Sequence, residues 1–272
     1  MFVPRLVASD LDGTLLRSDH QVSERTLAAL ARLRADGIPF VLVTGRPIRW
    51  LAPVLEQTGP VGPIVCANGA IVVDEAAGIV LAEWLIPAGV LAEVTATIRA
   101  HHPGLVFAVE RESGMLHEER YPVRWDVAID GKRVASYDDL VAEDAAKLLI
   151  RVVDEDADQT YEQVTALLDG AVTATHSGFA GLIEVTAAGV TKATGLAWLA
   201  QRYGVEPSRV LAFGDMPNDA PMLRWAGRGV VVAGAHPDAF DAADTVTLGN
   251  DADGVAAYLE ELLDATVSSP AE

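Results

Sequence analysis

Two aspartates stand one residue apart where a short apolar run ends. Asp10 and Asp12 follow the run Leu6–Ser9 and lead directly into Gly13 and Thr14. Side chains two apart on an extended segment project to the same side, and two buried carboxylates repel until one takes up a proton. A hard divalent cation removes this conflict, because Mg²⁺ binds one or two carboxylates together with water and phosphate oxygens. The pair therefore predicts a Mg²⁺ site.

The same two carboxylates suit phosphoryl transfer. Beside a bound cation, Asp10 can attack phosphorus as a nucleophile and form an aspartyl-phosphate. Asp12 can protonate the leaving oxygen and later deprotonate the attacking water. Gly13 leaves room for the chain to turn close to the phosphate. We therefore expect Asp10 and Asp12 to be catalytic residues.

Polar groups also follow two further apolar runs, and ligands bind at the carboxyl ends of parallel strands. In the stretch Thr44-Gly45-Arg46, the hydroxyl of Thr44 and the backbone N–H of Gly45 can donate to phosphate oxygens. Arg46 either holds the substrate or faces solvent. Lys192, one of three lysines in the chain, can supply positive charge where the transition state accumulates negative charge.

The second of these runs ends at the loop Gly214–Asp219. Asp215 is a natural further metal ligand from a separate strand, and Asn218 can donate to the phosphate. Asp219 can orient Lys192 or a metal-bound water. Acidic side chains also favour the N-terminus of a helix through the helix dipole alone, so that ordinary role stays open for both aspartates.

The elements that would position these residues alternate between two periodicities. Short apolar runs predict strands, and apolar residues at helical spacing predict helices. The expected strands cover Leu6–Ser9, Phe40–Val43, Ile64–Cys66, Val210–Phe213, Val230–Val232 and a short segment from Val246; the expected helices carry Leu27 to Leu33, Ile48 to Leu55, Thr191 to Ala200, Met222 to Leu223 and Val255 to Leu263. Apolar strands separated by helices indicate parallel strands covered on both faces. The sequence predicts an α/β fold with a doubly wound, mostly parallel, Rossmann-like core sheet.

The middle of the chain predicts an inserted domain. A helical pattern around residues 90–98 precedes the short alternating runs LVFAVE, LLIRVV, AVTATH and LIEV, with another helix over residues 158–168. This mixture indicates an α+β insertion between two halves of the core. We expect the core over residues 1–83 and 190–272 and a cap domain over residues 84–189.

The charge balance argues against two classes of partner. The chain carries 20 basic and 39 acidic residues, a net charge of −19, and shows no basic patch of the kind that nucleic acid or an anionic membrane requires. An anionic substrate would need local positive charge from a metal or from a few Lys and Arg. The single Cys66 suits a reducing compartment. With no evident signal peptide or bilayer-spanning run, we expect a cytoplasmic protein of undetermined oligomeric state.

As a set, the stretches SDLDGTLL, LVTGR, GVTKATGL and FGDMPNDAPML resemble the four motifs of the haloacid dehalogenase-like superfamily. The position of the insertion, together with ANGAIV and DADGVAAYL, is similar to the Cof-type branch with an α+β cap. The resemblance implies a Mg²⁺-dependent phosphatase with Asp10 as nucleophile, Asp12 as acid and base, and Asp215 as metal ligand. It also implies that the backbone carbonyl of Asp12 binds the metal. The chain departs from the pattern at Ala193, where a glycine is usual, and at Gly234, where an asparagine is common.

The prediction is hydrolysis of small organic phosphate monoesters, such as sugar phosphates or phosphorylated cofactors, with Lys192 as the third catalytic residue. The predicted metal ligands are Asp10, Asp12, Asp215 and Asp219, and the predicted substrate-binding residues are Thr44, Gly45, Arg46 and Asn218. A phosphotransferase or phosphosugar mutase using the same intermediate is the alternative. A non-catalytic phospho-receiver is disfavoured by the length of the chain. The candidates for selecting the leaving group are the cap residues Arg111, Arg120, Arg124 and His176.

Overall fold

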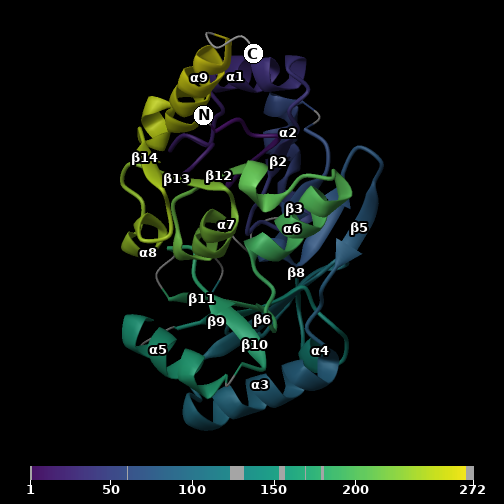
Figure 1. The fold of residues 1–272 in the computed structure, drawn as a ribbon. Coiled ribbons are helices and arrows are strands. Elements are labelled where there is room, and N and C mark those ends of the chain that lie inside the picture. The colour runs from purple at the N-terminus through teal and green to yellow at the C-terminus, as the bar shows by residue number, and fades with distance from the viewer. Residues whose placement is uncertain are drawn as a thin grey trace. The chain divides into compact units, whose positions relative to one another are not determined.

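A computed structural model describes residues 2–59, 61–122, 132–152, 157–168, 170–178 and 181–267. The chain divides into two compact units, one formed by Met1–Leu81 with Lys192–Glu272 and the other by Ala82–Thr191 (Figure 1). The first unit is thus built from two distant parts of the sequence, and the second unit is an insertion between them.

The first unit is organised around a five-stranded sheet in the order β14-β13-β12-β1-β2, in which every neighbouring pair is parallel. Its strands are β1 (Leu6–Ser9), β2 (Phe40–Leu42), β12 (Val210–Gly214), β13 (Arg228–Val232) and β14 (Thr245–Thr247). The residues of β1, β2 and β12 are all buried, as expected for a parallel sheet covered on both faces. The predicted doubly wound α/β core is confirmed.

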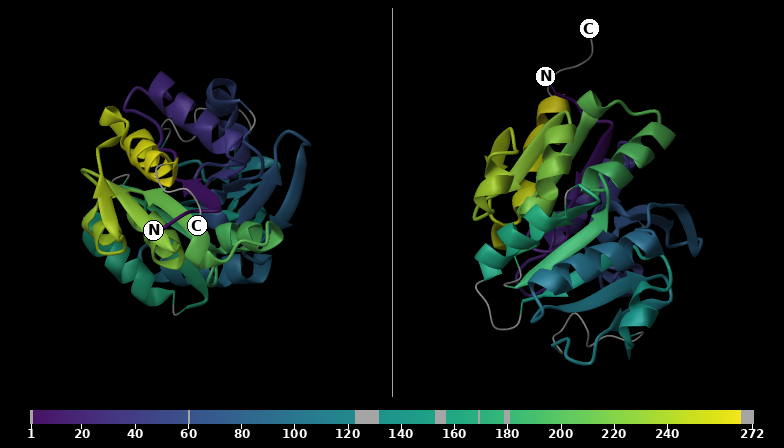
Figure 2. Two further views of the ribbon diagram at one scale, coloured as in Figure 1. Left: turned by 45° about the horizontal axis from the view of Figure 1, so that its top comes forward. Right: turned by 90° about the horizontal axis from the view of Figure 1, so that it is seen from below.

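Helices cover this sheet in pairs. The helices of the unit are α1 (Glu24–Ala35), α2 (Ala52–Thr58), α6 (Lys192–Arg202), α7 (Ala220–Trp225), α8 (Pro237–Phe240) and α9 (Gly254–Val267). Helix α1 packs beside α9, and α6 packs beside α7 (Figures 1 and 2). Helix α1 begins where the Ser23 hydroxyl caps the backbone N–H of Thr26 at 3.0 Å, which satisfies one of the free donors of the first turn.

The helix expected across Ile48 to Leu55 is interrupted. The structure has a short 3₁₀ turn, η1 (Ile48–Trp50), followed by the separate helix α2. Pro53 lies in the first turn of α2. Proline has no N–H and its ring clashes with the carbonyl four residues earlier, so it is tolerated at a helix start and prevents one continuous helix.

The strand after α2 pairs mainly outside the five-stranded sheet. Strand β3 (Ile64–Cys66) lies in a three-stranded sheet with β4 (Ile71–Asp74) and β5 (Ile79–Glu83), and its pairing with β4 is antiparallel. A single parallel bridge, Val43 to Val65, joins it to the segment after β2. Strands β4 and β5 follow the 3₁₀ turn η2 (Ala67–Gly69) and were not predicted from the sequence.

The second unit is an α+β arrangement around a six-stranded sheet in the order β10-β11-β9-β6-β7-β8. Its strands are β6 (Val106–Arg111), β7 (Gly114–His117), β8 (Lys132–Val134), β9 (Lys147–Arg151), β10 (Val172–Thr175) and β11 (Leu182–Ala187), and its helices are α3 (Ala88–His101), α4 (Tyr137–Val141) and α5 (Ala157–Leu167). Alternate strand residues such as Phe107, Ile150 and Val185 form one core with Leu91 and Ile98 of α3. The four alternating runs of the sequence are strands here, whereas β7, β8 and α4 were not expected.

Helix α6 packs so closely against β3 that one glycine is required. A Cβ added at Gly195 would lie 2.5 Å from Cγ1 of the buried Val65 and 3.2 Å from the carbonyl oxygen of Gly69. Neither atom is the free end of a flexible side chain. The first turn of the same helix carries Lys192, so this contact also fixes a predicted catalytic residue.

We therefore expect Gly195→Ala to destabilise the protein by about 1–3 kcal/mol, the usual cost of overpacking a core. The matched control is Gly89→Ala in α3, where an added Cβ meets no heavy atom within 4 Å. Urea unfolding followed by circular dichroism should show a lower midpoint for the first variant and no loss for the second. Equal midpoints for the two variants would contradict the close packing of α6.

Candidate active site

Three strand ends bring the predicted site together. Strand β1 lies between β2 and β12, so the residues that follow these strands meet at one edge of the sheet. The backbone N–H of Asp10 donates to the carbonyl of Phe213 at 3.0 Å, and the N–H of Val43 donates to Ser9 at 2.9 Å. Asp10, Thr44 and Asp215 therefore follow adjacent, hydrogen-bonded strands.

A buried ammonium lies between two carboxylates at this edge. Lys192 Nζ donates to Asp10 Oδ1 at 2.5 Å and to Asp219 Oδ1 at 2.6 Å. The exposed fractions of the three side chains are 1% for Lys192, 7% for Asp10 and 0% for Asp219. Burial alone lowers the pKa of a lysine, but the charges of Asp10 and Asp219 raise the pKa of Lys192 above its ordinary value. The ammonium is therefore a fixed positive charge.

Asp219 is held by its own loop as well as by the lysine. Its Oδ2 accepts from the backbone N–H groups of Asp215 at 3.0 Å and Met216 at 2.9 Å. A Cβ added at Gly214 would lie 2.5 Å from the Cβ of Asp219, so only glycine allows this approach. Asp219 thus connects the strand end to Lys192.

Asp215 is reached from the other side by the loop after β1. Thr14 Oγ1 donates to Asp215 Oδ1 at 2.5 Å, across a sequence distance that no local pattern reveals. Gly13 has φ +83°, a conformation that glycine adopts without strain, and a Cβ there would lie 2.5 Å from Asp215 Oδ2. Thr14 belongs to the first sequence motif, but no role was predicted for it. In the structure it is a hydrogen-bond donor to the Asp215 carboxylate.

Asp10, Asp215 and Asp219 form a cluster that suits a divalent cation. Their carboxylate oxygens lie within 4.8 Å of one another, and all three residues are buried. Burial raises the pKa of Asp10 well above its ordinary value, partly offset by Lys192 and increased by Asp219 and Asp215. Burial, with the charge of Asp219, raises the pKa of Asp215 to about 7. Buried carboxylates that resist ionisation in this way are relieved by a cation, which brings the opposite charge.

Asp12 does not belong to this cluster but forms a two-point ion pair with Arg46. Arg46 Nε donates to Asp12 Oδ2 at 2.7 Å, and Nη2 donates to Oδ1 at 2.5 Å. The Asp12 side chain is 37% exposed and that of Arg46 is 15% exposed. The two catalytic candidates of the first motif therefore differ: Asp10 is buried beside Lys192, whereas Asp12 is partly open to solvent.

The loop after β2 is joined to the turn after β3. The backbone N–H of Asn68 donates to the carbonyl of Thr44 at 3.1 Å, and that of Ala67 donates to the carbonyl of Arg46 at 3.0 Å. Ala67 and Asn68 both have positive φ, 52° and 56°, which is uncommon outside glycine and is often found at functional sites. The surrounding hydrogen bonds hold this unusual turn in place.

Asn68 also connects the two predicted phosphate-binding loops. Its Oδ1 accepts from Asn218 Nδ2 at 3.1 Å, and a Cβ added at Gly45 would lie 2.9 Å from the same oxygen. Both asparagines are buried. Asn68 is not among the binding residues predicted from the sequence; the available signal was its place two residues after the apolar run Ile64–Cys66.

The candidate cap residues have different surroundings. Arg111 is enclosed by backbone carbonyls, because its guanidinium donates to Asp144, Asp139, Leu140 and Glu143 at 2.7–3.3 Å. It therefore holds the end of α4 in place. Arg120 is exposed, the ring of His176 lies 5.0 Å from that of Tyr161, and Arg124 lies outside the described residues.

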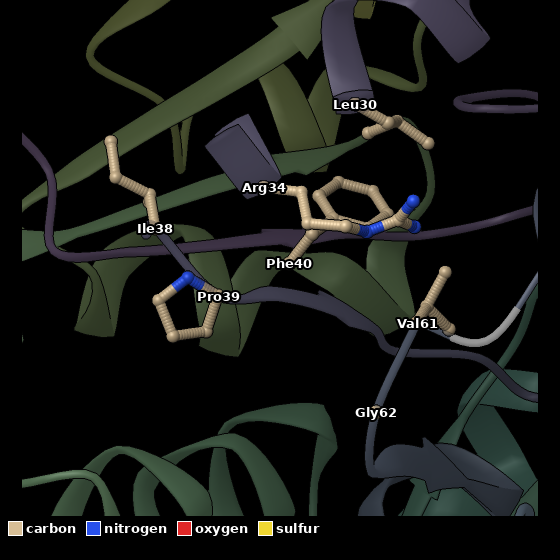
Figure 3. A pocket seen from close by; sticks show the side chains of 7 residues that line it. All are labelled: Leu30, Arg34, Ile38, Pro39, Phe40, Val61 and Gly62. Atoms are coloured by element: carbon tan, nitrogen blue, oxygen red, sulfur yellow. The ribbon is translucent and has the colours of Figure 1, made fainter. Parts of the chain in front are cut away.

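A cavity of about 240 Å³ lies elsewhere in the first unit. Figure 3 shows its lining by Leu30, Arg34, Ile38, Pro39, Phe40, Val61 and Gly62. Phe40 is the first residue of β2, so the cavity lies at the amino end of that strand, whereas the acidic cluster follows the carboxyl ends.

Within the described residues, no helix combines the length and apolar character that crossing a bilayer requires.

Comparison with known proteins gives a consistent family. The family model described as haloacid dehalogenase-like hydrolase matches residues 7–259. The chain is 31% identical over 266 residues to the 5-amino-6-(5-phospho-D-ribitylamino)uracil phosphatase YitU of Bacillus subtilis, covering 95% of this chain and 97% of that protein. It is 32% identical over 241 residues to the HMP-PP phosphatase of Cronobacter sakazakii, covering 86% and 85% of the two chains.

A solved structure agrees with these relatives. The phosphatase BT1666 of Bacteroides thetaiotaomicron, from the haloalkanoate enzyme superfamily, superposes with a TM-score of 0.82 at 29% identity, covering 96% of this chain and 95% of that chain. The likeness therefore extends over both units of the fold.

The raised pKa of Asp215 predicts how the metal-free protein responds to pH. The unfolded chain releases this proton near the ordinary value of 3.8, whereas the native protein keeps it up to about pH 7. As the pH rises from about 3.8 to about 7, the free energy of unfolding should therefore fall by about 1.4 kcal/mol per pH unit because of this group. Above pH 7 this contribution should level off.

Asp215→Asn should remove this contribution, which urea unfolding in EDTA at pH 5 to 8 can measure. Asp36→Asn, at an exposed position in the same unit, is the control and should retain it. An identical pH dependence in all three proteins would contradict the assignment.

Proposed function

The chain belongs to the haloacid dehalogenase-like hydrolase family and is a phosphatase of small phosphate compounds, and we propose that it works through a phosphorylated Asp10. The single observation that supports this proposal most strongly is the buried Lys192 between Asp10 and Asp219. The lysine keeps a positive charge beside the proposed nucleophile. An ammonium at this place stabilises negative charge that develops on a transferring phosphoryl group.

In the first step, a carboxylate oxygen of Asp10 attacks phosphorus while the bond to the leaving oxygen breaks. Asp12 donates a proton to that oxygen, and its greater exposure is consistent with access to a bound ester. Water then attacks the phosphorus of the acylphosphate, Asp12 takes a proton from it, and Asp10 is released with inorganic phosphate. Acid and base roles of this kind typically contribute 10²–10⁴-fold to a rate.

Asp10, Asp215 and the backbone carbonyl of Asp12 would hold a magnesium ion in this proposal. The fit is supported by the buried carboxylates of Asp10 and Asp215, which offer oxygens within 4.8 Å of each other. When bound, the ion supplies positive charge that neutralises phosphate oxygens. Asp219 was predicted as a metal residue or as an orienting residue for Lys192. Its contacts to Lys192 and to two backbone N–H groups favour the orienting role.

Thr44, Gly45 and Asn218 are proposed to bind the phosphate. This proposal is supported by Asn68, which joins the two loops that carry these residues. Asn68 forms hydrogen bonds with Thr44 and Asn218 and lies close to Gly45. Backbone and amide N–H groups fixed in this way need no reorganisation when an anion arrives.

The substrate is proposed to be a small organic phosphate ester. The related proteins are named for different compounds, a phosphoribitylamino-uracil and HMP-PP, and a third relative from Methanopyrus kandleri is named for phosphoglycolate. A panel that includes these compounds and sugar phosphates would identify the preferred class. A cytoplasmic location stays a prediction from the sequence.

We expect Asp10→Asn to reduce turnover of every phosphate ester by at least about a thousandfold, because an amide cannot replace the nucleophile. Release of inorganic phosphate from the panel, with Mg²⁺ present, measures this. Asp36→Asn, which changes an exposed carboxylate, should leave turnover unchanged. Normal turnover by the Asp10 variant would refute the proposed intermediate.

The proposed cation site predicts a stability change that does not depend on turnover. Mg²⁺ at about 100 times its Kd should raise the free energy of unfolding of the parent protein by about 2.7 kcal/mol. Asp215→Asn should lose most of this gain because it removes a charged ligand, and Asp36→Asn should keep it. Thermal or urea unfolding with and without Mg²⁺ tests this, and an equal gain in the Asp215 variant would count against the site.

A further inference from the structure

The ion pair between Arg46 and Asp12 joins a residue of the second motif to the proposed acid of the first. Two nitrogens of one guanidinium bind the two oxygens of one carboxylate, at 2.7 Å and 2.5 Å. Such a fork-to-fork pair fixes the direction and the rotation of the carboxylate, which a single contact does not. Arg46 thus determines where the Asp12 oxygens lie.

Arg46 is itself held on several sides. Its Nη1 donates to the carbonyl of Trp50 at 3.4 Å, and its backbone N–H donates to Thr44 Oγ1 at 3.0 Å. Its backbone carbonyl accepts from Ala67 at 3.0 Å. With its side chain 15% exposed, Arg46 is a partly buried and anchored residue, not a free surface arginine.

We propose that Arg46 is a positioning residue for the leaving-group half of the reaction, and this inference rests on the proposed function. In the form that reacts, Asp12 carries a proton on one oxygen, and Arg46 holds the carboxyl group so that this proton lies toward the departing oxygen. As the bond from Asp10 to phosphorus forms and the phosphorus–oxygen bond breaks, the electron pair of that bond passes to the leaving oxygen. The proton of Asp12 then completes the alcohol.

This role differs from the substrate-binding role predicted for Arg46. A residue that binds the phosphate affects every phosphate ester alike, because the phosphate is common to all of them. A residue that positions the acid matters only where the leaving oxygen needs a proton. The two roles therefore separate when the basicity of the leaving group is varied.

The experiment compares kcat/KM for an alkyl phosphate and for 4-nitrophenyl phosphate, whose nitrophenolate leaves without protonation. For Arg46→Gln we expect kcat/KM to fall about 10- to 100-fold for the alkyl ester, less than the full contribution of an acid, and to stay unchanged for the nitrophenyl ester. Since kcat/KM reports only the steps through loss of the leaving group, the later hydrolysis of the intermediate does not enter. Equal losses for both esters, or no loss for either, would overturn the inference.

Two further variants sharpen the result. Arg46→Lys keeps the positive charge but not the two-point contact, so it should remain impaired with the alkyl ester; full recovery would overturn the positioning role. The double variant Asp12→Asn with Arg46→Gln should be no worse than Asp12→Asn alone, because both changes remove the same function. An additive loss would also overturn it.

Matched controls separate this inference from the proposed function. Arg49→Gln changes a neighbouring arginine of η1 and should leave kcat/KM unchanged for both esters. If Asp12→Asn lowers kcat/KM equally for both esters, Asp12 is not the general acid, and the inference about Arg46 is wrong as well. If Asp12→Asn discriminates between the esters and Arg46→Gln does not, the inference about Arg46 alone is wrong.

Discussion

One buried ammonium between two carboxylates sets the conditions for the rest of the acidic site. Lys192 can remain charged away from water because Asp10 and Asp219 each accept a short hydrogen bond from it. Asp215 adds a third carboxylate to the same region, so negative charge exceeds the positive charge of the lysine. The raised pKa values of Asp10 and Asp215 follow from burial, together with the charges of the neighbouring carboxylates. The site is therefore built to receive further positive charge.

The close approach of the acidic groups depends on positions that lack a side chain. Gly13 and Gly214 each lie so near an aspartate that an added Cβ would come within 2.5 Å of it, and Gly195 allows the helix that carries Lys192 to reach β3. Glycine at such places costs conformational entropy. Here the three glycines allow the carboxylates and the ammonium to come within hydrogen-bonding distance, which offsets this cost.

The sequence predicted those strands and helices whose apolar periodicity can be recognised within a single segment. Wholly apolar runs identified the core strands, although the similar runs of β4 (IVVD) and β5 (IVLAE) were not recognised as strands. Strands β7 (GMLH) and β8 (KRV) are short and mixed in character, and no periodicity marks them. The same distinction applies to the site. Asp10, Asp215 and Lys192 stand in recognisable motifs, but the contact of Thr14 with Asp215 spans 201 positions. The partners of Asn68 and Arg46 likewise arise only when separate loops meet, so a single sequence left their roles open.

Every side chain of the acidic site comes from outside the insertion, which begins at Ala82 and ends at Thr191. Recombination between related genes can therefore exchange the whole inserted unit as a cassette without altering a residue of the acidic cluster. The two junctions are unequal in this respect. The first falls within β5, away from the cluster residues in the chain, whereas the second directly precedes Lys192. A graft at the second junction must preserve the start of α6, or the ammonium loses its place.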